Sequence, residues 1–103
     1  MKVAVIGSGG REHAICLSLK KSQKVKKIYC IPGNAGTHQI AENVEIEISN
    51  FSKIKDFILN NNIDLVIIGP EKPLVDGIVD YLEKFGVKVF GPNKIASQLE
   101  GSK

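Results

Sequence analysis

The chain begins Met1-Lys-Val-Ala-Val-Ile-Gly-Ser-Gly-Gly-Arg-Glu-His13, and this stretch organises the predicted fold. Residues 3–6 form an apolar run that is rich in β-branched side chains and too short for a helix, so they predict a buried strand. Gly7-Ser-Gly-Gly10 then predicts a tight turn whose backbone N–H groups can approach a ligand closely. A helix is expected over residues 12–22. Because the first amides of a helix lack intrahelical acceptors, this strand–turn–helix unit predicts a phosphate site.

The residues around the turn narrow the choice of phosphorylated ligand. The dinucleotide fingerprint has a third glycine where this chain has Glu12. It also has an acidic residue at the end of the second strand, where this chain has Tyr29-Cys-Ile-Pro32. A phosphate-loop NTPase would have a Lys-Ser or Lys-Thr pair after the glycines, and none follows Gly10. The sequence therefore favours a smaller phosphorylated ligand.

Length and composition indicate one globular domain over residues 1–103, with 24% charged residues and a net charge of +3. Arg11 is the only arginine, and a lysine cluster over residues 20–27 suits a helix C-terminus better than a nucleic acid. No apolar stretch approaches the ~18 residues of a membrane span, and no signal peptide precedes the first strand. We therefore expect a cytoplasmic protein in which Cys16 and Cys30 are buried and reduced.

Strands and helices alternate, which predicts an α/β fold with a parallel sheet and helices on both faces. Strands are expected at residues 3–6, 27–31, 44–48, 65–68 and 87–90. The wholly apolar first and fourth strands are expected at the centre. In the third, Val44, Ile46 and Ile48 alternate with two glutamates, which is typical of an edge strand. These features predict a Rossmann-like sheet of order 3-2-1-4-5, with the switch point between the first and fourth strands.

Helices are expected between these strands, each with an apolar face. The first is predicted to bury Ala14, Ile15 and Leu19, with Cys16 and Leu17 alongside. Pro32-Gly-Asn-Ala-Gly36 is expected to be a turn. Ser49 or Asn50 is expected to cap a helix from Phe51 that ends at Asn60-Asn-Asn62. A helix over residues 73–85 is predicted to bury Leu74, Val75, Ile78, Leu82 and Phe85, and a last short helix to bury Ile95 and Leu99.

Glycine-containing loops follow four of the strands, at residues 7–10, 32–34, 69–71 and 91–93. In a parallel sheet they lie at one carboxyl edge, where such folds bind ligands. Any one of these loops is explained by ordinary turn formation, but four at one edge favour a binding site. The residues offer no defensible nucleophile–base pair, metal triad or carboxylate pair, so we assign neither catalytic nor metal-binding residues.

Several side chains at this edge have two possible roles. Arg11 could clamp a phosphate or be an ordinary surface arginine. Glu12 could bind a hydroxyl or amine of the ligand, or simply interact favourably with the helix dipole. His13 is expected to be a packing residue. Glu71 could accept hydrogen bonds from sugar hydroxyls or an amine, and Asn34 and Asn93 present amides at the same rim.

The chain resembles the phosphoribosylamine–glycine ligase family in five stretches that occur in the family's order. They are Lys2 to Ala14, Pro32-Gly-Asn-Ala-Gly36, Gly69-Pro-Glu-Lys-Pro-Leu-Val-Asp-Gly77, Phe90-Gly-Pro92 and Gln98-Leu-Glu-Gly-Ser-Lys103. The resemblance implies the amino-terminal pre-ATP-grasp domain of an enzyme of purine biosynthesis. Such enzymes join glycine to 5-phosphoribosylamine and release ADP and phosphate. ATP and Mg²⁺ are then expected on ATP-grasp and C-terminal domains that would follow Lys103 in cis, and this chain alone is expected to be inactive.

Carried over to this sequence, the resemblance implies a substrate-binding set near phosphoribosylamine. Gly9, Gly10 and Arg11 would meet the 5-phosphate, and Glu12, Asn34 and Glu71 would lie near the ribose and amine, beside Gly69 and Pro70. The alternative is a stand-alone Rossmann-like module that binds a nucleotide or sugar phosphate without catalysis. A third possibility, a domain of an NAD-dependent oxidoreductase, is disfavoured by Glu12 and by the missing acidic residue.

Overall fold

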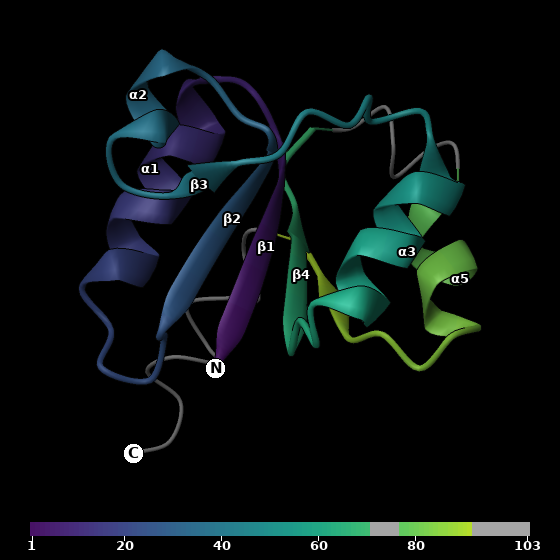
Figure 1. Cartoon of the computed structure of the whole chain (residues 1–103). Coiled ribbons are helices and arrows are strands. Elements are labelled where there is room, and N and C mark those ends of the chain that lie inside the picture. Colours follow the sequence, from purple (N-terminus) through teal and green to yellow (C-terminus); the bar gives the residue numbers. More distant parts are fainter. Residues whose placement is uncertain (71–76, 92–103) are drawn as a thin grey trace.

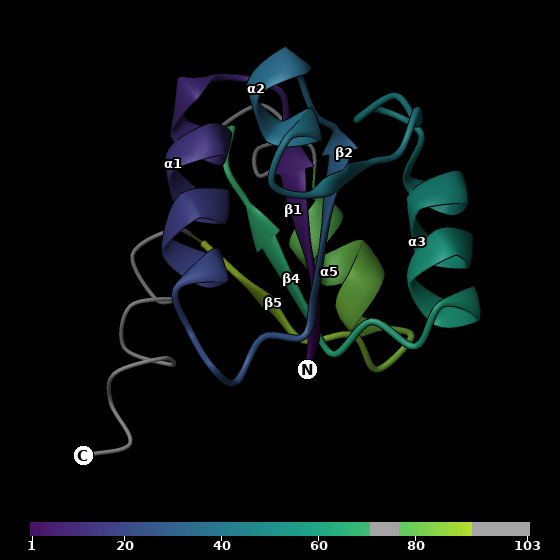
Figure 2. The ribbon, with the colours of Figure 1, turned by 60° about the vertical axis from the view of Figure 1, so that its left-hand side comes forward.

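A computed structural model describes residues 1–70 and 77–91 and shows a five-stranded sheet with helices on both faces (Figures 1 and 2). All the strand pairs are parallel, and the order is β3-β2-β1-β4-β5, which confirms the predicted topology. Helix α1 covers one face, and α3 and α5 cover the other. The elements are β1 Lys2–Gly7, α1 Gly10–Lys20, β2 Lys27–Pro32, α2 Ala35–His38, β3 Glu42–Asn43, α3 Phe51–Asn60, β4 Leu65–Ile68, α5 Ile78–Glu83 and β5 Val89–Phe90.

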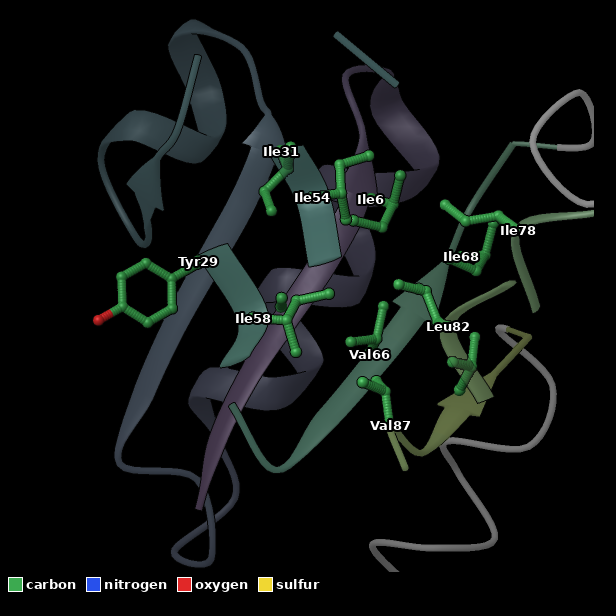
Figure 3. Close-up of a cluster of buried hydrophobic side chains, with 12 residues drawn as sticks. Ile6, Tyr29, Ile31, Ile54, Ile58, Val66, Ile68, Ile78, Leu82 and Val87 are labelled. Carbon is green, nitrogen blue, oxygen red and sulfur yellow. The ribbon is translucent and has the colours of Figure 1, made fainter. Parts of the chain in front are cut away.

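The central strands are buried on both faces because successive side chains of a strand point in opposite directions. In β1, Val3 and Val5 join the core beneath α1, while Ala4 and Ile6 join the core beneath α3 and α5. The side chains of β2 and β4 also alternate between the two cores. Figure 3 shows the second of these cores, in which Ile6 lies among side chains from β4, α3 and α5. The apolar runs in the sequence thus correctly predicted the two centrally placed strands.

The edge strand differs from its prediction. We expected a strand at residues 44–48, but β3 is only Glu42–Asn43. The Val44 N–H still donates to the Cys30 carbonyl at 2.9 Å, and then a tight turn, closed by Ile46 N–H to Val44 O at 2.9 Å, takes the chain off the sheet. Val44, Ile46 and Ile48 nevertheless pack against the core beneath α3. Alternation predicted which side chains pack against the core, where they are partly buried, but such packing does not require the backbone to pair in the sheet.

Helix α1 also corrects the prediction in two respects. It begins at Gly10 and ends at Lys20, two residues earlier at each end than expected. Its buried face consists of Glu12, Ile15, Cys16 and Leu19, whereas Ala14 and Leu17 are exposed. The apolar pattern therefore predicted the buried face of α1 slightly wrongly, because the carboxylate of Glu12 takes one of the positions on that face.

Helix α5 lies within the predicted range of residues 73–85, of which residues 73–76 are outside the described part of the chain. Ile78 and Leu82 are fully buried, as predicted, but Phe85 lies beyond the helix and is 43% exposed. Strand β5 is also two residues shorter than expected. The predictions for Leu74 and Val75, and for the last helix with Ile95 and Leu99, fall on residues outside the described ranges.

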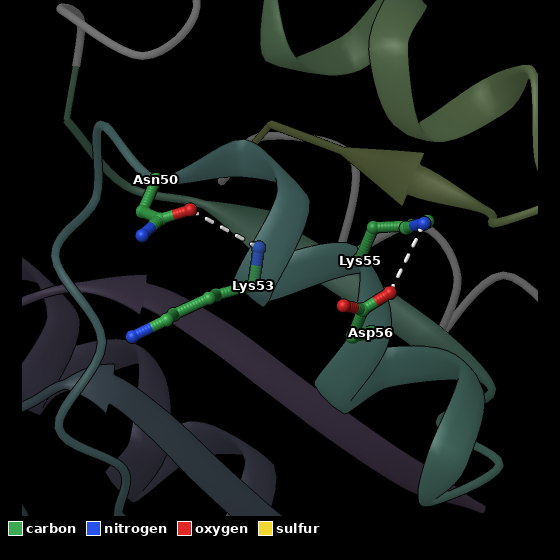
Figure 4. A network of polar contacts seen from close by, with 4 residues as sticks. All are labelled: Asn50, Lys53, Lys55 and Asp56. Atoms are coloured by element: carbon green, nitrogen blue, oxygen red, sulfur yellow. Dashed lines mark hydrogen bonds and ion pairs between the residues drawn. The ribbon is translucent and has the colours of Figure 1, made fainter.

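Helix α3 begins and ends where the asparagines predicted. Of the two candidate caps, Asn50 is the one used: its Oδ1 accepts a hydrogen bond from the Lys53 N–H at 3.2 Å (Figure 4). At the other end Asn61 is the C-cap, and Asn62 adopts a left-handed conformation with φ of 54°. The neighbouring Lys55–Asp56 ion pair in Figure 4 is exposed on the Asp56 side and contributes little to stability.

We expect Asn50→Ala to lower the free energy of unfolding by about 1 kcal/mol, because the Lys53 amide then loses its acceptor. Chemical denaturation followed by circular dichroism measures the change. Ser49→Ala is the matched control, since this exposed neighbour makes no side-chain hydrogen bond in the described part of the chain and its substitution should be nearly neutral. Equal losses in the two variants would contradict the assignment of the cap.

Candidate functional site at the carboxyl edge of the sheet

The loops after β1, β2 and β4 lie together at one edge of the sheet. Gly7 pairs with Pro32 in β2, and Ile6 pairs with Ile68 in β4, so these strands end side by side. Backbone hydrogen bonds continue beyond the strands, from Gly33 N–H to Gly7 O at 3.0 Å and from Gly69 N–H to Ile6 O at 3.1 Å. The described parts of these three loops therefore meet at the switch point, as the predicted topology required.

Glu12 is a buried component of the glycine turn, with a side chain only 5% exposed. Its Oε1 accepts a hydrogen bond from the Gly9 N–H at 2.7 Å, and Oε2 lies against Gly69. A Cβ at Gly7 would lie 2.5 Å from the Glu12 side chain, and a Cβ at Gly69 would overlap its carboxylate. The carboxylate thus occupies space vacated by two glycines from different strands. Glu12 stands at the position of the third glycine in the dinucleotide fingerprint.

Arg11 reaches across the switch point from α1 to Gly69. Its side chain is exposed, and Nη1 donates to the Gly69 carbonyl at 2.9 Å, joining α1 to the loop after β4. A guanidinium has five N–H donors, so this single bond leaves others for an anion. Arg11 therefore joins α1 to the loop after β4, a structural contact that the sequence did not reveal, and its role toward a phosphate stays a prediction.

The first turn of α1 provides backbone donors beside Arg11. Gly9 is the N-cap, and having no side chain it cannot satisfy the orphan amides that follow. The N–H groups of Gly10, Arg11 and Glu12 have no intrahelical acceptors, because the helix starts at Gly10. These amides lie at the positive end of the helix dipole, where an anion is stabilised.

Asn34 is an anchor for the glycine turn. Its Nδ2 donates to the Ser8 carbonyl at 2.7 Å and to the Gly9 carbonyl at 3.3 Å, while Oδ1 accepts from the Thr37 N–H at 2.9 Å. It is also the N-cap of the short helix α2, in a stretch that we had expected to be only a turn. Both ends of the side-chain amide are therefore already bonded within the domain.

Two residues that contribute to this edge were missed in the sequence. The Thr37 side chain is fully buried, and it contacts Asn34 and Asn43 through hydrogen bonds. Asn34-Ala-Gly-Thr37 forms a capping box, and a polar residue three positions after an asparagine was the signal for it. No comparable signal marks Asn43, because its contact with Thr37 depends on how β3 is placed.

The other predicted site residues are positioned unequally. Pro70 is half-buried next to Gly69 at the crevice. The His13 ring lies against Gly36 of α2, where a Cβ would be 3.1 Å from it, in keeping with the expected packing role. Glu71 and Asn93 lie outside the described residues, so their predicted roles stay predictions.

Cys16 and Cys30 are buried free thiols beneath the glycine turn, as predicted. The Cys30 thiol lies 3.5 Å from the Gly7 carbonyl, to which it can donate. The hydrogen bond with Cys30, and then burial, raise the pKa of the Cys16 thiol above its usual value. Cys16 is therefore a neutral packing residue at physiological pH.

Some cavities in the described part of the chain lie away from these loops. One of about 560 Å³ is lined by Met1, Asp64, Gly86 and Phe90 at the amino ends of β1 and β4. Parallel α/β sheets bind their ligands at the opposite edge, so we place the functional site at the glycine turn. Across residues 1–70 and 77–91, no helix has both the length and the apolar character needed to cross a bilayer.

The sheet order and the glycine turn at its switch point define a Rossmann-like α/β domain. The family model described as "Phosphoribosylglycinamide synthetase, N domain" matches residues 1–100, and the chain belongs to this family. This confirms the resemblance found in the sequence.

Individual relatives agree with this family. The chain is 57% identical over 103 residues to a phosphoribosylamine–glycine ligase of Caldanaerobacter subterraneus subsp. tengcongensis, and 47% identical to one of Clostridium acetobutylicum. Each match covers 100% of this chain and 25% of the relative, so the chain spans about a quarter of these relatives' length. A crystal structure of the Thermotoga maritima ligase matches with a TM-score of 0.50 and 30% identity, covering 70% of this chain and 16% of that one.

Proposed function

We propose that this chain is the amino-terminal, substrate-side domain of a phosphoribosylamine–glycine ligase. That enzyme would join glycine to 5-phosphoribosylamine to give glycinamide ribonucleotide, with ATP converted to ADP and phosphate. The observation that carries the proposal is that the first turn of α1 presents amides without intrahelical acceptors at the switch point, where the Arg11 guanidinium donates to the Gly69 carbonyl. Family membership and the 25% coverage of the relatives support a domain of a longer ligase.

In this proposal the site binds the phosphorylated sugar. The amides beside Gly9 and Gly10, with the free donors of Arg11, hold the 5-phosphate. Gly69 and Pro70 form the facing wall, and Glu71 receives the ribose or amine. Glu12 and Asn34 act mainly by holding the turn in place, since their polar atoms are already bonded to it.

The ligand chemistry is set by Glu12. Its carboxylate lies against Gly7 and Gly69 and accepts from the Gly9 N–H, and Gly9 is the second glycine of the fingerprint, where the backbone would approach a dinucleotide pyrophosphate. A second phosphate there would meet a buried negative charge. A single phosphate at the outer amides avoids this repulsion, which favours a sugar monophosphate over a dinucleotide.

The remaining reactants are proposed to bind outside this domain. Within residues 1–70 and 77–91, no group of three or more His, Cys, Asp or Glu side chains could hold a metal ion. Because the chain spans about a quarter of the ligases that it matches, we propose that ATP and Mg²⁺ bind to ATP-grasp and C-terminal domains in cis. We also propose a cytoplasmic location, in which Cys16 and Cys30 stay reduced.

The test is a titration of the ¹⁵N-labelled chain with ribose 5-phosphate, which supplies the phosphate and the ribose. We expect chemical-shift changes centred on the amides of residues 9–12. Arg11→Ala should weaken binding by about tenfold, because one charge-assisted contact is lost. Lys21→Ala, an exposed cation just beyond the far end of the same helix, is the control and should not change the affinity. Shifts centred away from residues 9–12 would contradict the proposed site.

A further inference from the structure

The glycine turn is held by a compact group of polar side chains behind it, formed by Asn34, Thr37 and Asn43. We propose that Thr37 and Asn43 are positioning residues that set the affinity of the turn for a phosphorylated sugar, although neither touches the ligand. This inference rests on the proposed function, and it extends that function to residues whose side chains face away from the site.

Hydrogen bonds link all three residues of the group and hold the backbone of Asn34 at both its N–H and its carbonyl. The Thr37 hydroxyl accepts from the Asn34 N–H at 2.7 Å and donates to Asn43 Oδ1 at 2.7 Å, with the Asn34 carbonyl at 3.0 Å as its alternative acceptor. Asn43 Nδ2 in turn donates to the Asn34 carbonyl at 2.8 Å. Backbone and side chain of Asn34 are both fixed, so its Nδ2 has one direction in which to donate.

That direction fixes a peptide plane of the glycine turn. The Ser8 carbonyl points to Asn34 Nδ2, and in a trans peptide the following N–H points the opposite way. This is the Gly9 N–H, which donates to Glu12 Oε1 at 2.7 Å. Asn34 therefore holds the plane from its carbonyl side, and Glu12 holds it from its N–H side.

Fixing this plane matters because the turn is rich in glycine. Glycine samples more backbone conformations than other residues, and ordering it on binding costs conformational entropy. A turn that is already held presents the amides of Gly10 and Arg11 to a phosphate without that cost. Preorganisation of this kind raises affinity without adding any contact to the ligand.

The surrounding backbone accommodates the group. Gly33 has φ of 78°, and a Cβ there would overlap the Asn43 side chain and lie 2.8 Å from Thr37 Oγ1. Asn43 is the last residue of the short strand β3 and pairs with Cys30 of β2, which places its amide beside Asn34. The pairing of the two-residue strand β3 with β2 thus places Asn43 where it can bond to Asn34.

The test compares Thr37→Val with Thr37→Ser in the ¹⁵N-labelled chain. Valine keeps the shape of threonine and removes the hydroxyl, whereas serine keeps the hydroxyl. We expect Thr37→Val to weaken ribose 5-phosphate binding by about tenfold and to increase backbone motion at residues 8–10 in the free protein, measured by ¹⁵N relaxation. Thr37→Ser should restore both to within about twofold of the unsubstituted chain.

Two further measurements keep the outcomes separate. Asn43→Ala breaks the same group from its partly exposed side and carries the test if Thr37→Val does not fold, with the exposed Asn60→Ala as matched control. A folded Thr37→Val or Asn43→Ala variant with unchanged motion at residues 8–10 overturns the inference, as does unchanged affinity. If the unsubstituted chain does not bind ribose 5-phosphate, the proposed function fails, while the relaxation data still judge the positioning role.

Discussion

Gly69→Ala is expected to lower the free energy of unfolding by about 2–3 kcal/mol, a large effect for a single methyl group. The new Cβ would overlap the carboxylate of Glu12, which has little freedom to move away. Its Oε1 is held by the Gly9 N–H, and its aliphatic part lies against Gly7. Urea denaturation of the chain, followed by circular dichroism, measures the loss.

The physical cause can be isolated with a double-mutant cycle. Glu12→Ala alone should also destabilise the chain, because the Gly9 amide loses its acceptor and a cavity remains. In the double variant the alanine at position 69 has room, so the combined loss should be smaller than the sum of the two. Gly91→Ala is the control, since a Cβ there meets nothing within 4 Å among residues 1–70 and 77–91. Additive losses would show that Glu12 and Gly69 do not compete for the same space.

The second large effect is expected for Asn34→Asp, which should weaken ribose 5-phosphate binding by about 2 kcal/mol, or roughly 30-fold. Aspartate keeps the oxygen that accepts from the Thr37 N–H, so α2 stays capped. It lacks the Nδ2 donor, however, and places a carboxylate against the Ser8 and Gly9 carbonyls. The turn is then released on one side, and the added negative charge opposes the incoming phosphate.

Asn50→Asp is the matched control for this prediction. It makes the same substitution at another helix N-cap, on α3, and therefore changes the net charge by the same amount. The same NMR titration should give an unchanged affinity for Asn50→Asp. A similar loss in both variants would mean that net charge, rather than the anchoring of the glycine turn by Asn34, controls the binding.

The predictions at residue level succeeded where burial alone was sufficient. The apolar runs at residues 3–6 and 65–68 placed β1 and β4 at the centre of the sheet, and asparagine chemistry placed both ends of α3. They failed at the edge strand and at the end of α5. The strand observed is Glu42–Asn43 instead of residues 44–48, and Phe85 lies beyond α5 and is exposed instead of buried.

The candidate site shows the same division. The alternation of strands and helices predicted that the loops after β1, β2 and β4 lie at one edge of the sheet, which the strand pairing shows. The same sequence reading identified Arg11, Glu12 and Asn34 as candidate site residues. It could not determine that Glu12 is buried against Gly69, nor that Arg11 donates to the carbonyl of that residue, 58 positions away.

By itself, the sequence determined the alternation of strands and helices, the order of the sheet and the family of this domain. These properties are encoded in local periodicity and in short motifs, which need no knowledge of distant neighbours. Only the tertiary structure decided which polar side chains hold the glycine turn. Asn34 comes from the start of α2 and Asn43 from β3, and their hydrogen bonds to the Ser8 carbonyl, Thr37 and the Asn34 carbonyl, at 2.7–2.8 Å, form only when these elements are packed together.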